Sequence, residues 1–169
     1  KRHFETTGPN EKWTTDVSEF KLPTGKLYLS PILDMYDSSI ISYDISTSPS
    51  LEQTKRMLNE AFKQYPNLEG LIFHSDQGWQ YQHQYYINEL KKKGILQSFS
   101  RKGNCMDNSL MENFFGILKQ EMYYGTTYYS FEELKDAIER YIKYYNEKRI
   151  KEKLGWMSPV EYRLNTLAA

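Results

Sequence analysis

The sequence lacks several features that would place it in a specialised class of protein. It holds a single cysteine, Cys105, which excludes an intramolecular disulfide and fits a reducing compartment such as the cytoplasm. It has no signal peptide and no apolar run near the roughly 20 residues that cross a bilayer, so we expect no membrane role. Its 22 basic residues match its 22 acidic residues, which argues against a protein that packages DNA by bulk positive charge.

The sequence does contain enough apolar and aromatic residues for one packed domain. Of its 169 residues, 39% are hydrophobic and 15% are aromatic, a composition typical of a globular core. This length suits one well-buried domain and is too short for two of ordinary size. We therefore expect residues 1–169 to form a single domain. Because the chain starts at Lys1 without an initiating methionine, we expect it to be excised from a longer protein.

The apolar periodicity predicts strands first, then alternating helices and strands, then helices. Strands are expected over residues 12–20, 27–35, 39–46, 68–73 and 95–99. Helices are expected to begin at Ser50, near residue 81, at Asp107 or Asn108, at Ser130 and at Ser158. The first three strands should form an antiparallel meander, and Pro31 predicts an edge position or a bulge in the second. This order predicts an α/β fold, a mixed sheet with helices on both faces.

Three acidic residues from separate elements draw attention as a possible metal site. Asp76 should follow the fourth strand, Glu112 should lie about one turn into a helix, and 35 residues separate them. Asp16 lies within the first expected strand, where aspartate is uncommon. If that strand pairs with the fourth, Asp16 and Asp76 should lie within a few ångströms of each other. Each acid alone could equally be ordinary surface.

Together these carboxylates would offer hard oxygen ligands and no histidine or thiolate. Such a set favours Mg²⁺ or Mn²⁺ over zinc. Two such ions about 3.5–4 Å apart could activate an attacking hydroxyl and stabilise the leaving oxygen of a phosphodiester. A zinc site built from His74, His83 and Cys105 is not expected, because these residues lack metal-finger spacing. We expect His74 to orient the loop that carries Asp76, and Cys105 to be structural.

The residues that share a helix face with Glu112 could contact nucleic acid. Asn108, Gly116 and Lys119 lie on that face at helical spacing. A glycine there costs about 1 kcal/mol of helix stability relative to alanine, and its missing side chain would let a DNA backbone come close. Lys119 should lie about 10 Å further along, beside a neighbouring phosphate. The alternative is a tolerated glycine and a solvated lysine.

A basic segment leads into the same helix. Residues 91–106 contain no acidic residue, and five basic residues occur among Lys91–Lys93, Arg101 and Lys102. In a neutral protein, this local asymmetry indicates a loop that faces phosphates. A run of lysines on a solvated surface is the plainer explanation.

Several motifs, in order along nearly the whole chain, resemble the catalytic core of insertion-sequence transposases, the bacterial relatives of retroviral integrase. The motifs are Trp13-Thr14-Thr15-Asp16, His74-Ser75-Asp76-Gln77-Gly78, Ser100-Arg101-Lys102-Gly103-Asn104-Cys105 with Asp107-Asn108, Glu112-Asn113-Phe114-Phe115-Gly116 with Leu118-Lys119, and a tail from Tyr144 to Tyr162. The resemblance implies an RNase H-like mixed five-stranded sheet. It also implies that the DDE triad Asp16, Asp76 and Glu112 binds two Mg²⁺ or Mn²⁺ ions.

The same resemblance implies a reaction and partners. Water cleaves a DNA strand, and the freed 3′-hydroxyl then attacks another phosphodiester. The partners would be transposon-end and target double-stranded DNA, bound by a homo-oligomer. Lys119 and Asn108 match the family's DNA-contacting basic residue and its polar residue before the glutamate, and Arg101 and Lys102 lie in the basic loop.

The match has departures, and two other functions stay open. Trp79 stands where the family usually has a small polar residue, and Lys151 where a histidine is common. The family's N-terminal helix-turn-helix region is not in this sequence. An RNase H-like nuclease that only hydrolyses is one alternative, although no fourth acid matches such an enzyme. A DNA-binding or oligomerisation domain with a relict site is the other.

Overall fold

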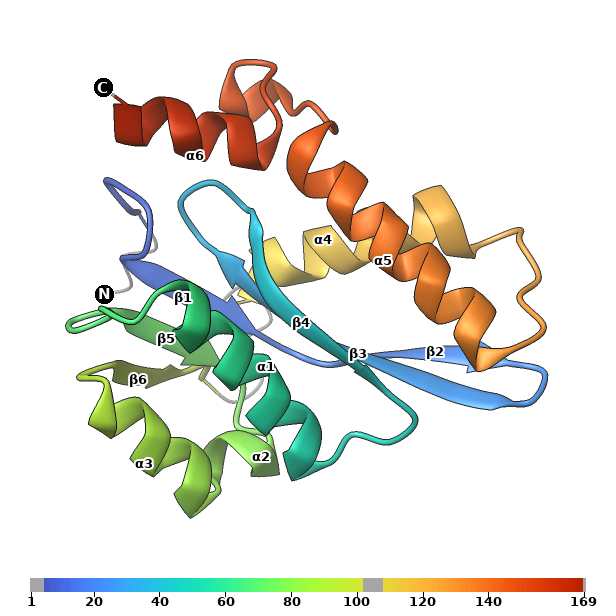
Figure 1. The fold of residues 1–169 in the computed structure, drawn as a ribbon, viewed down its shortest axis with the longest axis horizontal. Coiled ribbons are helices and arrows are strands. Elements are labelled where there is room, and N and C mark those ends of the chain that lie inside the picture. Colours follow the sequence, from blue (N-terminus) through green and yellow to red (C-terminus); the bar gives the residue numbers. More distant parts are fainter. Residues whose placement is uncertain (1–4, 102–107, 169) are drawn as a thin grey trace.

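A computed structural model describes residues 5–101 and 108–168, and the core of this part is a strongly twisted mixed sheet (Figure 1). Six strands occur in these residues: β1 Lys12–Thr15, β2 Ser18–Leu22, β3 Gly25–Asp34, β4 Ile40–Ser46, β5 Ile72–Ser75 and β6 Leu96–Phe99. Their order is β2-β3-β1-β5-β6, and β4 also pairs with β3. The pairs that β3 makes are antiparallel, whereas β1–β5 and β5–β6 are parallel.

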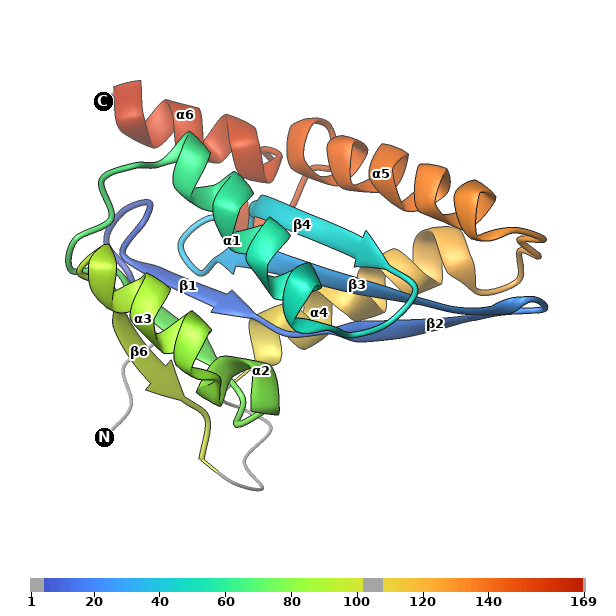
Figure 2. The same ribbon diagram turned by 60° about the horizontal axis from the view of Figure 1, so that its bottom comes forward.

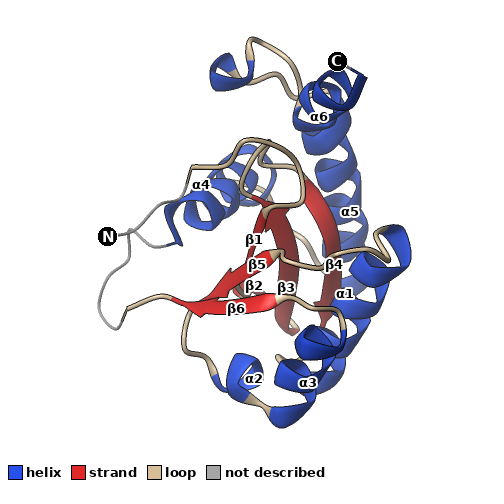
Figure 3. Ribbon diagram, turned by 90° about the vertical axis from the view of Figure 1, so that its left-hand side faces the viewer, coloured by secondary structure: helices blue, strands red, loops and turns tan. Residues whose placement is uncertain are grey.

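Helices lie on both faces of this sheet, as Figure 3 shows. They are α1 Leu51–Gln64, α2 Trp79–Gln82, α3 Gln84–Lys92, α4 Ser109–Leu118, α5 Phe131–Glu147 and α6 Pro159–Ala168, with a π-helical turn η2 Lys119–Tyr123 and a 3₁₀ turn η3 Glu152–Leu154. No helix in the described ranges is long and apolar enough to cross a membrane. The predicted α/β architecture with helices on both faces is confirmed.

Two apolar clusters hold these layers together. One lies under α1 and α3 and contains Trp13, Met57, Phe73, Tyr81 and Tyr86 among others. The other lies under α4 and α5 and contains Phe20, Leu29, Phe114, Ile138 and Tyr145 among others. In Figure 2, α1 lies in front of β3 and α4 lies behind it. The sheet is therefore a buried middle layer, and its strand ends are where polar groups can gather.

The first predicted strand, residues 12–20, is wrong as a single element. It divides into β1 and β2 at Asp16, which is why the described sheet has six strands and the predicted one had five. Thr15 pairs with Ile32 and Ser18 pairs with Leu29, so the same register would place Pro31 opposite Asp16. Proline has no N–H to donate across a ladder, so the pairing is interrupted there.

Other predicted boundaries also need correction. Pro31 lies in the central strand β3 and not at an edge, but the alternative prediction of a bulge agrees with the register shift between β3 and β4 at Ile32/Leu33. The strand predicted over 68–73 begins later, because Gly70 has φ of +87° and turns the chain before β5. The helix predicted over 81–93 is divided at His83, which is extended and caps α3 by accepting from the Tyr85 N–H at 3.1 Å.

Predicted helix starts are confirmed at their serines. Ser158 and Glu161 form a reciprocal capping box, with N···O distances of 3.3 and 3.1 Å. Ser50 and Ser130 each accept one backbone N–H of their helices. Gln53, at the third position of the first of these helices, was expected to complete a capping box with Ser50. It does not, because its side-chain amide donates to the carbonyls of Tyr28 and Asp44 instead.

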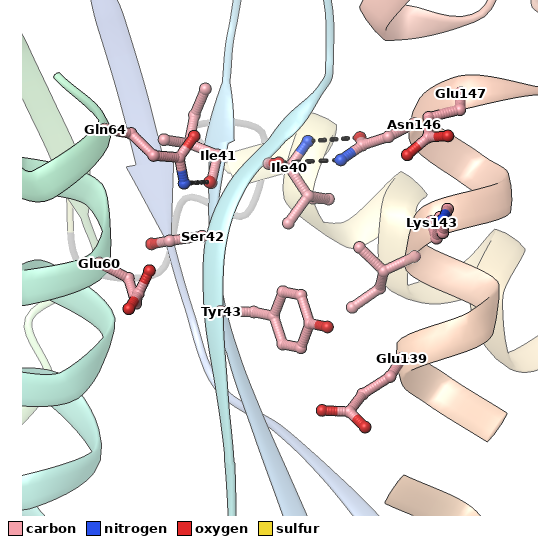
Figure 4. A pocket seen from close by; sticks show the side chains of 11 residues that line it. Ile40, Ile41, Ser42, Tyr43, Glu60, Gln64, Glu139, Lys143, Asn146 and Glu147 are labelled. Carbon is pink, nitrogen blue, oxygen red and sulfur yellow. Dashed lines mark hydrogen bonds between the residues drawn. The ribbon is translucent and has the colours of Figure 1, made fainter. Parts of the chain in front are cut away.

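Side chains from two helices cover part of the outer edge of β4. Asn146 of α5 accepts from the Ile40 N–H at 2.9 Å and donates to the Ile40 carbonyl at 3.0 Å. Gln64 of α1 donates to the Ile41 carbonyl at 2.7 Å. These contacts border a cleft of about 500 Å³ between α1, β4 and α5 (Figure 4). They satisfy backbone groups that an edge strand would otherwise expose to another chain.

A buried ion cluster fixes α6 to the rest of the domain. Arg163 donates from Nη1 to Asp34 and to Asp37, both at 2.8 Å. Its other nitrogens donate to Asn10 at 2.5 Å and to the Tyr65 hydroxyl at 3.2 Å. Burial and the neighbouring Asp37 charge raise the pKa of Asp34, and Arg163 opposes them. The guanidinium is therefore the counter-charge of two buried aspartates.

Candidate acidic site at the ends of β1 and β5

Two of the three predicted site residues follow the carboxyl ends of neighbouring strands. Asp16 directly follows β1, and Asp76 directly follows β5. These strands are parallel neighbours, with Thr14 paired to His74, so their carboxyl ends coincide. The predicted pairing of the first strand with the fourth is confirmed.

Asp16 has the most perturbed environment of the three acids. Burial raises its pKa to about 6, and the charges of Asp76 and Glu112 add to this rise. The Val17 N–H, which donates to Asp16 Oδ1 at 2.8 Å, opposes the rise. The structure therefore brings Asp76, at a strand end, and Glu112, in the first turn of α4, close enough for their charges to act on Asp16.

Asn108 links α4 to this edge. It occupies the N-cap position of α4, but its side chain makes no capping hydrogen bond. Instead it accepts from the Thr14 hydroxyl at 2.8 Å and donates to Asp16 Oδ2 at 3.4 Å. Both Asn108 and Thr14 are buried. The start of the helix that carries Glu112 is thus attached to the strand that carries Asp16.

The Asp76 loop is held by short-range contacts. The Gly78 N–H donates to Asp76 Oδ1 at 2.8 Å. A Cβ on Gly78 would lie 3.0 Å from that oxygen and 2.8 Å from Gln80 Oε1, so a side chain here would displace the carboxylate. His74 contacts the hydroxyls of Ser98 and Ser100, each at 2.9 Å, which attaches β5 to β6 and the residue after it, and its predicted role toward the Asp76 loop stays a prediction. Burial lowers the pKa of His74, and the Asp76 charge opposes this.

The acids are near one another without converging on one point. Among residues 5–101 and 108–168, no three His, Cys, Asp or Glu side chains form a group that could hold a metal ion as they stand. The donor set nevertheless fits a hard divalent cation, because it is made of carboxylate oxygens with the amide of Asn108 beside them. A cation would also relieve the repulsion that raises the pKa of Asp16.

The predicted DNA-contacting residues are less closely grouped. Lys119 donates to the Glu19 carbonyl at 3.1 Å and lies 4.8 Å from the centre of the Phe20 ring, so its ammonium contacts β2. Burial lowers the pKa of Lys119. Arg101 is exposed just beyond β6, and Lys102 falls outside the described residues, as does Cys105. The roles of these residues stay predictions.

Sequence reasoning missed Thr14 and Gly78 as supports of the site. The polar alternation of Thr14 with Asp16 was a usable signal, whereas the contact of Gly78 depends on the folded loop. Trp79, the departure noted above, starts α2 three residues after Asp76 and is 55% exposed. An exposed aromatic ring therefore flanks the acidic edge.

Comparison with known families identifies the domain. Two models described as integrase core domain match it, over residues 6–105 and 112–167. The chain belongs to the integrase core domain family. This integrase core is 55% identical over 168 residues to an uncharacterized transposase-like protein of Haemophilus influenzae, covering 98% of the chain and 76% of that protein. It is 50% identical over 165 residues to the putative transposase InsK of insertion sequence element IS150 from Escherichia coli K12, covering 98% and 58%.

Solved structures confirm the RNase H-like fold of this integrase core. The catalytic core of HTLV-2 integrase, solved in complex with magnesium in a trimeric form, superposes with a TM-score of 0.73 at 17% identity, covering 94% of this chain and 99% of that one. The catalytic core of BIV integrase gives 0.72 at 18% identity, covering 94% and 97%. The two bacterial relatives are thus described as a transposase-like protein and as a putative transposase.

Proposed function

We propose that this integrase core is the catalytic domain of a transposase and acts as a polynucleotidyl transferase. Its reaction would be divalent-metal-dependent DNA strand cleavage followed by strand transfer from the 3′-hydroxyl. The observation that carries the proposal is the position of Asp16 and Asp76 at the ends of two neighbouring parallel strands of an integrase core, with Glu112 close enough for its charge to act on Asp16. In this proposal, residues 1–169 form one catalytic domain.

Each carboxylate has a defined part in the proposed reaction. Asp16 and Asp76 would hold metal from the strand ends, and Glu112 would hold it from α4. Mg²⁺ or Mn²⁺, as a pair when bound, would supply an activated hydroxyl and charge stabilisation for the leaving oxygen. Asn108 orients Asp16 through its amide, and the Gly78 N–H orients Asp76. These contacts restrict the carboxylates before any cation arrives, which lowers the cost of assembling the site.

Double-stranded DNA from the transposon ends and the target is the proposed substrate. Glu112 is exposed and lines a shallow hollow of about 450 Å³ on α4 and η2, together with Gly116 and Gln120 among others. A phosphate backbone could approach the site over this surface. We further propose action as a homo-oligomer, since the HTLV-2 integrase core has been solved as a dimeric and as a trimeric form.

A strand-transfer assay tests the proposed function. The protein is incubated with Mn²⁺ and DNA that carries the pre-cleaved ends of its own insertion element, with a plasmid as target. Joined product is the expected result. Cleavage without joining would favour the purely hydrolytic nuclease. Binding of DNA with neither reaction would favour a domain with a relict site.

Gly116→Ala tests whether a DNA backbone approaches α4. Gly116 is exposed within the helix, and a Cβ there would meet no atom within 4 Å. The free protein should therefore gain about 0.5–1 kcal/mol of unfolding free energy, as alanine is the better helix former. DNA affinity should nevertheless fall several-fold, because the added methyl group occupies the approach path. Urea unfolding and fluorescence anisotropy measure the two effects, and a stabilised variant with unchanged DNA affinity would refute the close approach.

A further inference from the structure

The hollow on α4 and η2 begins at Glu112 and ends at Glu121. Its lining residues form one stripe along the helix: Glu112, Asn113, Gly116, Ile117, Gln120 and Glu121. At a rise of about 1.5 Å per residue, Glu121 lies about 13 Å along the helix axis from Glu112. Phosphates of one DNA strand advance by about 3.4 Å each along a duplex. A strand that follows this stripe, with one phosphate at the acidic site, would have another near Glu121.

The stripe itself offers no positive charge to a phosphate. The residues that line it include two acids and no basic residue. Lys119, the residue predicted to contact DNA, is directed to β2, where its ammonium donates to the Glu19 carbonyl at 3.1 Å. Phosphate contacts in protein–DNA complexes are made largely by basic side chains, by polar side chains and by backbone N–H groups. A phosphate backbone on the stripe therefore needs a cation from a neighbouring element.

Arg149, which follows α5, is a cation that reaches the end of this stripe. Its Nε–H is shared between Glu121 Oε1 at 3.0 Å and Oε2 at 3.1 Å, and its Nη2 donates to Oε2 at 2.7 Å. Nη1 makes no hydrogen bond with any residue in the described ranges. The Arg149 side chain is also 22% exposed. Because a guanidinium carries five N–H donors, donors of Arg149 remain for an incoming anion.

Glu121 does not depend on Arg149 alone. The hydroxyl of Tyr141, a buried residue of α5, donates to Glu121 Oε1 at 2.7 Å. The carboxylate therefore keeps a hydrogen-bond donor when the guanidinium moves to another acceptor. Since an acceptor left without any donor is the costly outcome, this second contact lowers the cost of exchanging Glu121 for a phosphate oxygen.

Lys151 adds a second positive charge beside Arg149. Its ammonium lies 5.1 Å from the centre of the Tyr145 ring, and that ring stacks on Tyr141 with centroids 6.4 Å apart. Lys151 forms no ion pair with any residue that the structure describes. Burial lowers its pKa to about 8, and the charges of Arg149 and Lys153 contribute to this. An anion bound here would relieve the repulsion among these cations.

We propose that Arg149, with Lys151 beside it, binds a backbone phosphate of the substrate DNA at the end of the stripe away from Glu112, and that Glu121 competes with this phosphate for the guanidinium. The inference rests on the function proposed above and adds a contact between this domain and its DNA. Arginine suits such an exchange, because its planar fork matches the oxygens of a carboxylate and of a phosphate equally.

Two substitutions in this ion pair should change DNA affinity in opposite directions. Arg149→Gln should weaken binding of a labelled duplex that carries one end of the insertion element about threefold to tenfold. It should also lower the slope of log affinity against log salt by roughly one. Glu121→Gln keeps an acceptor for Tyr141 but removes the competing charge, and should strengthen binding about twofold to threefold. Fluorescence anisotropy at several salt concentrations measures both effects, and thermal unfolding checks the fold.

Arg56 and Asp44 provide a matched control pair. Arg56 of α1 binds both oxygens of Asp44 in β4, at 2.8 and 3.0 Å. In Figure 2, α1 and α4 lie on opposite sides of β3, so this ion pair is remote from the stripe. Arg56→Gln and Asp44→Asn should each leave DNA affinity within twofold of the wild type. Arg149→Lys keeps the charge without the fork, and should retain the salt slope while losing part of the affinity.

The outcomes separate this inference from the proposed function. If the wild type binds the duplex and Arg149→Gln binds it equally well with an unchanged salt slope, the role of Arg149 is wrong and the proposed function stands. If Arg149→Gln and Glu121→Gln both weaken binding, the ion pair is structural and the inference is also wrong. If Arg149→Gln does not fold, unchanged affinity in Glu121→Gln overturns the competition. A wild type that does not bind the duplex contradicts the proposed DNA substrate itself.

Discussion

Asp76→Asn is expected to reduce Mn²⁺-dependent DNA cleavage by roughly 10³-fold or more while leaving the fold intact. Asparagine has the shape of aspartate, and its amide oxygen can still accept from the Gly78 N–H that now holds Asp76 Oδ1 at 2.8 Å. What the substitution removes is the negative charge that would hold the cation. Cleavage of labelled transposon-end DNA measures the loss, and circular dichroism checks the fold.

Asp136→Asn is the matched control for this variant. Asp136 is exposed on α5, and the same change of chemistry there should leave cleavage within twofold of the wild type. The Asp76→Asn protein should also unfold at no lower temperature than the wild type, because it loses a charge that raises the pKa of Asp16 by repulsion. Cleavage retained at wild-type rates in Asp76→Asn would remove Asp76 from the proposed triad.

Arg163→Met should lower the free energy of unfolding by about 3–5 kcal/mol. Arg163 is the counter-charge of Asp34 and Asp37, and both of these aspartates are fully buried. Methionine fills much of the same volume but removes the counter-charge, although the N–H groups of Asn10, Tyr36 and Ser39 still donate to the two carboxylates. Since a domain of this size is typically stable by only about 5–15 kcal/mol, the loss is a large share. Urea unfolding followed by far-UV circular dichroism measures it.

A combined variant shows whether charge or packing causes this loss. Adding Asp34→Asn and Asp37→Asn to Arg163→Met removes the uncompensated charges and should recover a substantial part of the lost stability. A single Arg163→Met variant that loses less than about 1 kcal/mol, the range of an exposed ion pair, would show that the cluster is no more stabilising than a surface contact. If the triple variant stays as unstable as the single one, packing of the guanidinium is the main contribution.

The sequence predicted what local patterns control. Serine caps predicted three helix starts, and the apolar run before His74 predicted that Asp76 would follow a strand paired with β1. The break at Asp16 was not predictable in this way, since it depends on which residue of β3 lies opposite. The partner of Lys119 was missed for a related reason, because its ammonium contacts the Glu19 carbonyl, 100 positions earlier in the chain.

Contacts between residues distant in sequence could not be predicted either, because they too depend on tertiary packing. Arg163 and Asp34 are 129 positions apart, and no periodicity connects them. Asn108 and Thr14 are 94 positions apart, and only the folded chain brings their side chains within hydrogen-bond distance. Side-chain identity marked the acids as candidates, but tertiary packing decides which polar groups support them.

The side chain of Asn108 holds Asp16 in place, and as a result it does not cap α4. An asparagine at an N-cap ordinarily stabilises its helix by about 1 kcal/mol, but here the amide is directed to Thr14 and Asp16 instead. The start of α4 thus remains less stable than its sequence permits. Such a sacrifice is characteristic of a trade-off between stability and activity, in which the best-folded sequence and the best catalyst differ. Selection for thermal stability alone would then act on this helix start first, at the expense of the acidic edge.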